Sequence, residues 1–175
     1  MSGYLNTSTS LKEFQILHRD EFFVDKSGII DQLNKRIFSK NRYICITKPR
    51  RFGKTSLLNM LGAYYGKSYD TRSLFDTLEI GKSKDYLTHL NKYNVISMCL
   101  NNLSDKGNTY DDYIDLIKNS FKRDIAAAYP ELESREFNSI SDMLAATGDE
   151  FIFIIDEWDY IFSHDLYPEH QGDFL

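Results

Sequence analysis

The residues Gly53-Lys54-Thr55 have the types and the order that phosphate binding requires. An apolar run from Tyr43 to Thr47 precedes them and predicts a strand, and a helical pattern from about Lys54 to Tyr65 follows. In this order the amides of the turn and of the first helical turn point toward one spot, where the helix dipole favours negative charge. The sequence therefore predicts a loop that binds a triphosphate.

The spacing of this loop departs from the usual Walker A pattern. Lys48 stands where that pattern has its first glycine, and Pro49 biases Lys48 toward an extended conformation. The triplet alone is weak evidence, because the chain also contains Gly66-Lys67-Ser68 and Gly81-Lys82-Ser83. The first of these predicts a helix C-cap, and the second follows a segment without strand character. The alternative for Gly53 is a basic surface turn.

A second group of residues suited to chemistry follows the apolar run Phe151 to Ile155. Asp156 and Glu157 come directly after it, where a carboxylate carries a desolvation cost unless something pairs with it. The carboxyl ends of parallel strands line the ligand crevice, so Asp156 is predicted to hold Mg²⁺ with Thr55 as the hydroxyl partner. Glu157 is predicted to orient or deprotonate an attacking water. The alternative is a strand-terminal turn with solvated charges.

The elements that must position these residues alternate between strand and helix. The predicted strands are 43–47, 94–100 and 151–155, and the predicted helices are about 28–37, 54–65, 84–92, 110–129 and 139–146. This alternation predicts an α/β layered domain. Residues 10–25 are expected to hold an extended entry, and Ser27 to cap the helix that follows. Asp25 and Lys26 are expected in a solvated helix start, with contact to a nucleotide as the alternative.

Composition limits the class of partner. A formal charge of −5 argues against general binding to nucleic acid or anionic membranes, whereas four cations within seven residues predict a confined anion; they are Lys48, Arg50, Arg51 and Lys54. No window has the length of a membrane span. Cys45 and Cys99 lie in apolar runs and predict reduced core thiols, which favours a cytoplasmic protein. The four histidines show no metal-ligand spacing with the cysteines.

Three stretches together give a specific resemblance to a known family. They are Phe22-Phe-Val-Asp-Lys-Ser27, Lys48-Pro-Arg-Arg-Phe-Gly-Lys-Thr55 and Ile154-Ile-Asp-Glu-Trp-Asp159. The chain resembles the bacterial AAA-ATPase-like family over most of its length, and that family's loop also lacks the first glycine. Trp158 departs from the tyrosine that is usual there.

The resemblance implies a P-loop NTPase-like, three-layer α/β fold with a mainly parallel sheet that is incomplete at the C-terminus. It implies ATP and Mg²⁺ as cofactors, Lys54 and Glu157 as catalytic residues, and Thr55 and Asp156 as metal ligands. The implied nucleotide contacts are Pro49, Arg50, Arg51, Phe52, Gly53, Lys54, Thr55 and Ser56. Arg50 and Arg51 are expected to neutralise phosphate or to act across a subunit boundary.

The same resemblance predicts how the chain is organised. Residues 1–42 form an N-terminal extended segment and helix, and residues 43–175 form a partial nucleotide-binding core. Family members usually continue with a polar sensor, an arginine and often a PD-(D/E)XK nuclease-like domain, all absent from these 175 residues. In that fold the strand between the two site strands would begin after residue 175, so we expect a truncated ATPase or a fragment of one.

Three functions follow as alternatives from the sequence. The chain hydrolyses ATP, it holds a nucleotide without hydrolysis, or its basic loop contacts nucleic acid in a full-length context. Self-association or a partner protein is expected to complete the sheet, and no membrane partner is expected.

Overall fold

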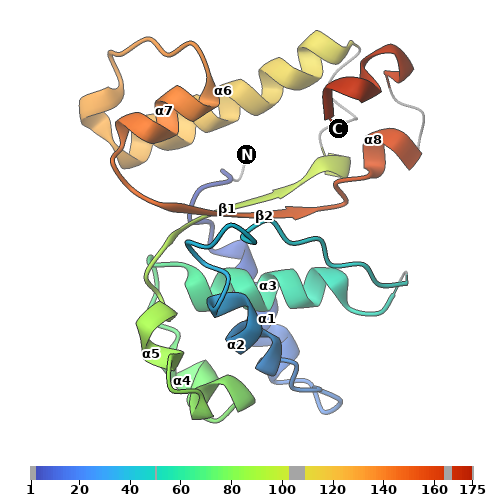
Figure 1. The fold of residues 1–175 in the computed structure, drawn as a ribbon, viewed down its shortest axis with the longest axis vertical. Coiled ribbons are helices and arrows are strands. Elements are labelled where there is room, and N and C mark those ends of the chain that lie inside the picture. Colours follow the sequence, from blue (N-terminus) through green and yellow to red (C-terminus); the bar gives the residue numbers. More distant parts are fainter. Residues whose placement is uncertain (1–2, 50, 103–108, 164–166, 175) are drawn as a thin grey trace. The chain divides into compact units, whose positions relative to one another are not determined.

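The computed structural model describes residues 3–49, 51–102, 109–163 and 167–174. The chain divides into two compact units, one formed by Ser8–Val95 and the other by Met1–Thr7 with Ile96–Leu175. Each unit is described by itself. Figure 1 gives the order of the elements along the chain by colour.

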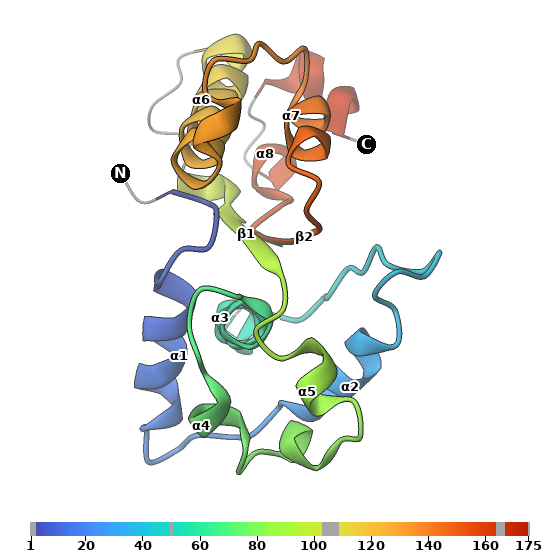
Figure 2. The same ribbon diagram turned by 90° about the vertical axis from the view of Figure 1, so that its left-hand side faces the viewer.

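The unit Ser8–Val95 is built mainly from helices. Its elements are α1 (Thr9–His18), α2 (Gly28–Asn34), α3 (Lys54–Tyr65), α4 (Arg72–Phe75), the 3-10 turn η1 (Glu79–Lys82) and α5 (Tyr86–His89). Helix α1 packs against α3, and Figure 2 shows α3 end-on with α1 crossing beside it. The core between them is aromatic. Phe14 of α1 is fully buried and stacks on Phe75 with 5.0 Å between ring centroids, and Tyr64 of α3 meets Phe75 at 5.4 Å.

The C-terminal end of α3 is satisfied by a side chain from further along the chain. Asn91, in the left-handed region with a φ of 55°, donates from Nδ2 to the carbonyls of Ala63, Tyr64 and Gly66. These carbonyls belong to the group that a helix end leaves without partners. A Cβ on Gly66 would lie 2.8 Å from the Gly62 carbonyl oxygen, so only glycine fits there. The predicted helix end at Gly66 is confirmed.

The second unit contains the sheet. Its elements are β1 (Asn94–Cys99, which starts in the first unit), α6 (Tyr110–Ala128), α7 (Ile140–Ala146), β2 (Phe151–Asp156), α8 (Tyr160–Ser163) and the 3-10 turns η2 (Leu100–Asn102), η4 (Pro130–Leu132) and η5 (Pro168–Phe174). Strands β1 and β2 are parallel neighbours. At the other edge of β1 the Ser97 amide donates to the Tyr4 carbonyl at 2.9 Å, and Leu5 forms an antiparallel bridge with Ile96.

Helices α6 and α7 connect the two strands and lie over one face of the pair (Figure 1). Thr109 and Asp112 form a reciprocal capping box at the start of α6. Ile125, Leu132 and Met143 form one buried cluster between α6 and α7. Parallel strands require such a crossover, and helices are its usual content.

Several predicted elements are confirmed. Helices α3, α6 and α7 and strands β1 and β2 lie within a residue or two of their predicted bounds. The mixture of helices with parallel strands agrees with the α/β class. Gly148 follows α7 with a φ of 70°, as expected for a glycine after a helix end.

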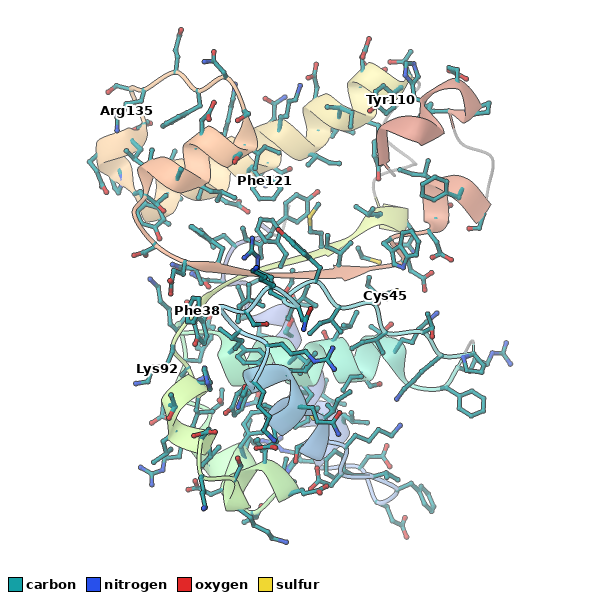
Figure 3. All side chains as sticks on the ribbon, viewed as in Figure 1. Phe38, Cys45, Lys92, Tyr110, Phe121 and Arg135 are labelled. Atoms are coloured by element: carbon teal, nitrogen blue, oxygen red, sulfur yellow. The ribbon has the colours of Figure 1, made fainter. Side chains whose placement is uncertain are left out.

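Other predictions are wrong. No strand forms within residues 42–49, where the Tyr43 side chain is 82% exposed and Cys45 is exposed rather than in a core. The physical reason is that no described segment offers backbone hydrogen bonds to this run. Figure 3 shows Cys45 on the segment that leads into α3.

The N-terminal region also differs from expectation. Residues 9–18 form helix α1 rather than an extended entry, because Ser10 and Phe14 lie one turn apart and share a buried face. Helix α2 ends at Asn34, and the predicted helix 84–92 is reduced to the four residues of α5.

Candidate functional site

The Gly53 loop has the backbone shape that the sequence predicted for a phosphate site. Gly53 caps α3 in the left-handed region, with φ 74° and ψ 35°, and its carbonyl accepts the first helical hydrogen bond from the Leu57 amide at 3.0 Å. The Phe52 amide donates to the Pro49 carbonyl at 3.3 Å, which closes a turn just before it. Arg51 is also left-handed, with a φ of 65°. The loop therefore turns sharply and leads directly into the exposed amides of a helix start.

The side chains predicted for this loop lie on one continuous stretch. Lys48, Lys54 and Ser56 are half-buried, and Thr55 is exposed. Phe52 is 63% exposed. Pro49 and Arg51 are exposed as well, whereas Arg50 lies outside the described residues. Lys54 is the first residue of α3, so its ammonium and the helix dipole act on the same region.

Side chains hold the segment before α2 in place, so the expectation of a solvated helix start is wrong for Asp25, whereas Lys26 is exposed as expected. The Asp25 carboxylate accepts from the Ser27 amide at 2.8 Å and from the Glu79 amide at 2.7 Å. Ser27 is fully buried, and its hydroxyl accepts from the Ile80 amide at 3.1 Å. Ser27 is the N-cap residue of α2, as predicted, but its side chain makes no capping hydrogen bond to α2, because its hydroxyl accepts from the Ile80 amide of η1 instead.

The ionisation of Asp25 reflects these contacts. Burial alone raises the pKa of a carboxyl group, but the hydrogen bonds from Ser27 and Glu79 and the charge of Lys82 hold the pKa of Asp25 below its usual value. The carboxylate is thus kept charged while it fastens the segment.

Lys26, for which the sequence predicted nucleotide contact only as the alternative, lies beside the loop. A Cβ built on Gly53 would lie 3.5 Å from the Lys26 Nζ, so the ammonium lies against the Gly53 backbone. The motif around Asp25 contributes to the family resemblance. It could not reveal the contact with η1, because η1 is more than fifty residues away in sequence.

The acidic strand end belongs to the other unit. Asp156 is the last residue of β2 and is half-buried, and its Oδ1 accepts from the Glu157 amide at 3.0 Å. Glu157 is left-handed, with a φ of 50°, so the chain turns sharply after the strand. The strand is buried on one face only, although its residues 151–155 are all apolar. Ile154 is buried, whereas Phe153 and Ile155 are exposed, because alternate side chains of a strand point to opposite faces.

Cys99 lies near this acid pair. Burial raises the pKa of the Cys99 thiol, and the negative charges of Asp156 and Glu157 raise it further. The Cys99 thiol donates to Asn101 Oδ1 at 2.9 Å. The expectation that Cys99 is a core thiol is wrong, since it is half-buried at the end of β1. Its place as the last residue of a parallel strand was the signal for this proximity.

The Gly53 loop and the Asp156–Glu157 pair belong to different units of the chain. In the part of the chain that the structure describes, no three or more histidine, cysteine, aspartate or glutamate residues converge as a ready metal site. Within the same described ranges, no helix has both the length and the apolar character needed to cross a membrane.

The comparisons with known proteins add one finding. A family model described as AAA-ATPase_like, Predicted AAA-ATPase, matches residues 9–171. No curated protein and no solved structure was found to match the chain. The family match spans both units and includes the Gly53 loop and the acidic strand end.

Proposed function

Since the chain belongs to the family of predicted AAA-ATPases, we propose that it is an ATP-binding P-loop protein. The observation that carries the proposal is the left-handed Gly53 directly before helix α3. This backbone turn presents the amides of a helix start and the positive end of the helix dipole to an anion. The order of apolar run, basic turn and helix is the order of a P-loop.

In this proposal the amides of Gly53 and Lys54 cradle the β and γ phosphates, and the Lys54 ammonium contacts the same oxygens. The remaining loop residues contribute further contacts to the nucleotide: Pro49, Arg50, Arg51, Phe52, Thr55 and Ser56. Arg50 and Arg51 neutralise phosphate charge or act across a subunit boundary.

The proposal also includes a metal ion and a hydrolytic role. The Thr55 hydroxyl and the Asp156 carboxylate are hard oxygen donors of the kind Mg²⁺ prefers, so their chemistry fits that ion. Bound Mg²⁺ would neutralise charge on the phosphates. Glu157 would orient the attacking water or take its proton.

The exposed run Tyr43–Thr47 supports a larger, three-layer P-loop fold in which residues 43–175 are part of the core. An apolar, β-branched run whose backbone groups form no backbone hydrogen bond with the described residues is suited to pair with another strand. We propose that this strand comes from a longer form of the chain, as in a truncated ATPase, from a second copy or from a partner protein. A bacterial source and an associated nuclease-like domain are further predictions of the resemblance. The free thiols of Cys45 and Cys99 support a reducing compartment such as the cytoplasm.

Titration of a fluorescent ATP analogue with Mg²⁺ tests the central claim. The unaltered chain should bind it, and Lys54→Ala should weaken binding by at least about tenfold, since a charged hydrogen bond contributes about 1.5–3 kcal/mol. Lys92→Ala is the matched control and should bind like the unaltered chain. Lys92 follows Asn91 at the C-terminal end of α3, about 18 Å from its start (Figure 3).

Phosphate release then separates the remaining alternatives. Release that vanishes in Glu157→Gln supports an ATPase, whereas tight binding without release identifies a nucleotide-binding module. Absence of nucleotide binding, or equal binding by Lys54→Ala, would reject the nucleotide proposal. Steeply salt-dependent DNA binding with no effect of nucleotide would favour the nucleic-acid alternative.

A further inference from the structure

Lys26 sits between two anchored residues. Asp25 and Ser27, on either side of it, are bonded to the Glu79 and Ile80 amides of η1. The backbone on both sides of Lys26 is therefore fixed, and the position of its Cα is set by contacts to a distant part of the unit. An ordered backbone lowers the entropy that a long side chain must lose when it binds.

The direction of the side chain is equally specific. The Lys26 ammonium lies 3.5 Å from the position of a Cβ on Gly53, which is the residue whose left-handed turn opens the phosphate loop. The Lys26 side chain is exposed, and among the described residues it forms no ion pair. A cation beside the start of a helix favours an anion there, because the helix dipole also attracts negative charge.

The positive charges around the Gly53 loop also favour a phosphate ligand. Lys26 adds a positive charge beside a loop that carries Lys48, Arg51 and Lys54, and no acidic side chain of the described residues forms a salt bridge with any of the four. Like charges in one place repel each other, and a phosphate chain with several negative charges would relieve that repulsion.

We propose that Lys26 is a second phosphate-contacting lysine, which reaches the bound nucleotide from the segment before α2. The inference rests on the proposed function, since the phosphates are those of the ATP held by the Gly53 loop. Asp25 and Ser27 are positioning residues that act through Lys26. The Phe22–Ser27 motif thereby gains a physical role in the site.

The test is titration of the fluorescent ATP analogue with Mg²⁺ against Lys26→Gln, Lys26→Arg and the control Lys92→Gln. Lys26→Gln should weaken binding about tenfold, as expected for one charge-assisted hydrogen bond. Lys26→Arg should retain most of the affinity because it keeps the charge. Lys92→Gln should bind like the unaltered chain. Competition with AMP should show a smaller loss in Lys26→Gln, because AMP offers fewer phosphates.

The outcomes separate this inference from the proposed function. If the unaltered chain binds the analogue and Lys26→Gln binds it equally well, Lys26 is not a phosphate contact and the proposed function stands. Equal weakening by Lys26→Gln and Lys92→Gln also overturns the inference, since it would reflect net charge alone. If the unaltered chain does not bind, both fail. Thermal melts of each variant check the fold, and the retained affinity of Lys26→Arg distinguishes lost charge from lost structure.

Discussion

Two apolar runs of this chain have similar composition and different surroundings. Phe151–Ile155 forms most of strand β2, which pairs with β1 and lies under α6 and α7. Tyr43–Thr47 forms no strand and no backbone hydrogen bond with the described residues, and its Tyr43 and Ile44 side chains are exposed. The difference shows that an apolar, β-branched run is only a candidate strand. Whether the strand forms depends on hydrogen-bond partners for its backbone amides and on packing against its side chains.

Hydrogen exchange should separate the two environments most strongly. The amides of Ile44–Thr47 should exchange at nearly unfolded rates, because no described residue accepts hydrogen bonds from them. The Ser97 amide in β1, bonded to Tyr4 at 2.9 Å, should exchange at least about a thousandfold more slowly, which corresponds to about 4 kcal/mol of opening free energy. Equal protection of both runs in the monomer would break the comparison and would contradict an incomplete sheet.

The same substitution in each run gives the next largest contrast. Ile154→Ala should lower the free energy of unfolding by about 2–4 kcal/mol, because the Ile154 side chain is only 8% exposed and its loss leaves a cavity. Ile44→Ala should change it by less than about 0.5 kcal/mol, since Ile44 is 40% exposed. Chemical denaturation measures both values. A large loss in Ile44→Ala would mean that this run is packed in solution.

The two cysteines provide the smallest contrast, one for each environment. Cys45 is exposed and should react readily with Ellman's reagent. Cys99 is half-buried and its pKa is raised. Because the thiolate is the reactive form, the reaction rate of Cys99 should increase only at a higher pH than the rate of an ordinary thiol. At pH 8 we expect Cys99 to react more slowly than Cys45, because its raised pKa leaves less thiolate and partial burial limits access to it. The single variants Cys45→Ser and Cys99→Ser assign each rate, and equal rates would contradict the contrast.

Much of the fold could be predicted where local signals agree. Gly53 and Gly66 bound helix α3, and α6 ends before Pro130, as the sequence predicts. Glycine and proline mark these ends because each restricts or frees the φ angle of its own residue. Strand β2 followed from five apolar residues in a row. In each case the deciding physics lies within a few residues of the element.

The remaining features depend on residues far apart in sequence. Helix α1 was missed because Phe14 alone carries most of its buried apolar face. The exposure of Tyr43 depends on whether a partner strand is present. The nearness of Lys26 to Gly53 depends on the bonds from Asp25 and Ser27 to η1, which no local pattern encodes. Local sequence therefore places the predicted loop residues on one stretch. For Lys26 the sequence left two alternatives, and its position beside Gly53 required the structure.

The amide of Asn91 at the end of α3 has an evolutionary consequence. Position 91 must combine a left-handed backbone with two N–H donors for the carbonyls of α3 and an oxygen that accepts from the Thr71 amide. Glycine supplies only the backbone, aspartate lacks the donors, and glutamine is less suited to the left-handed region. Relatives should therefore keep asparagine at this position, and those that change it should also change residue 71.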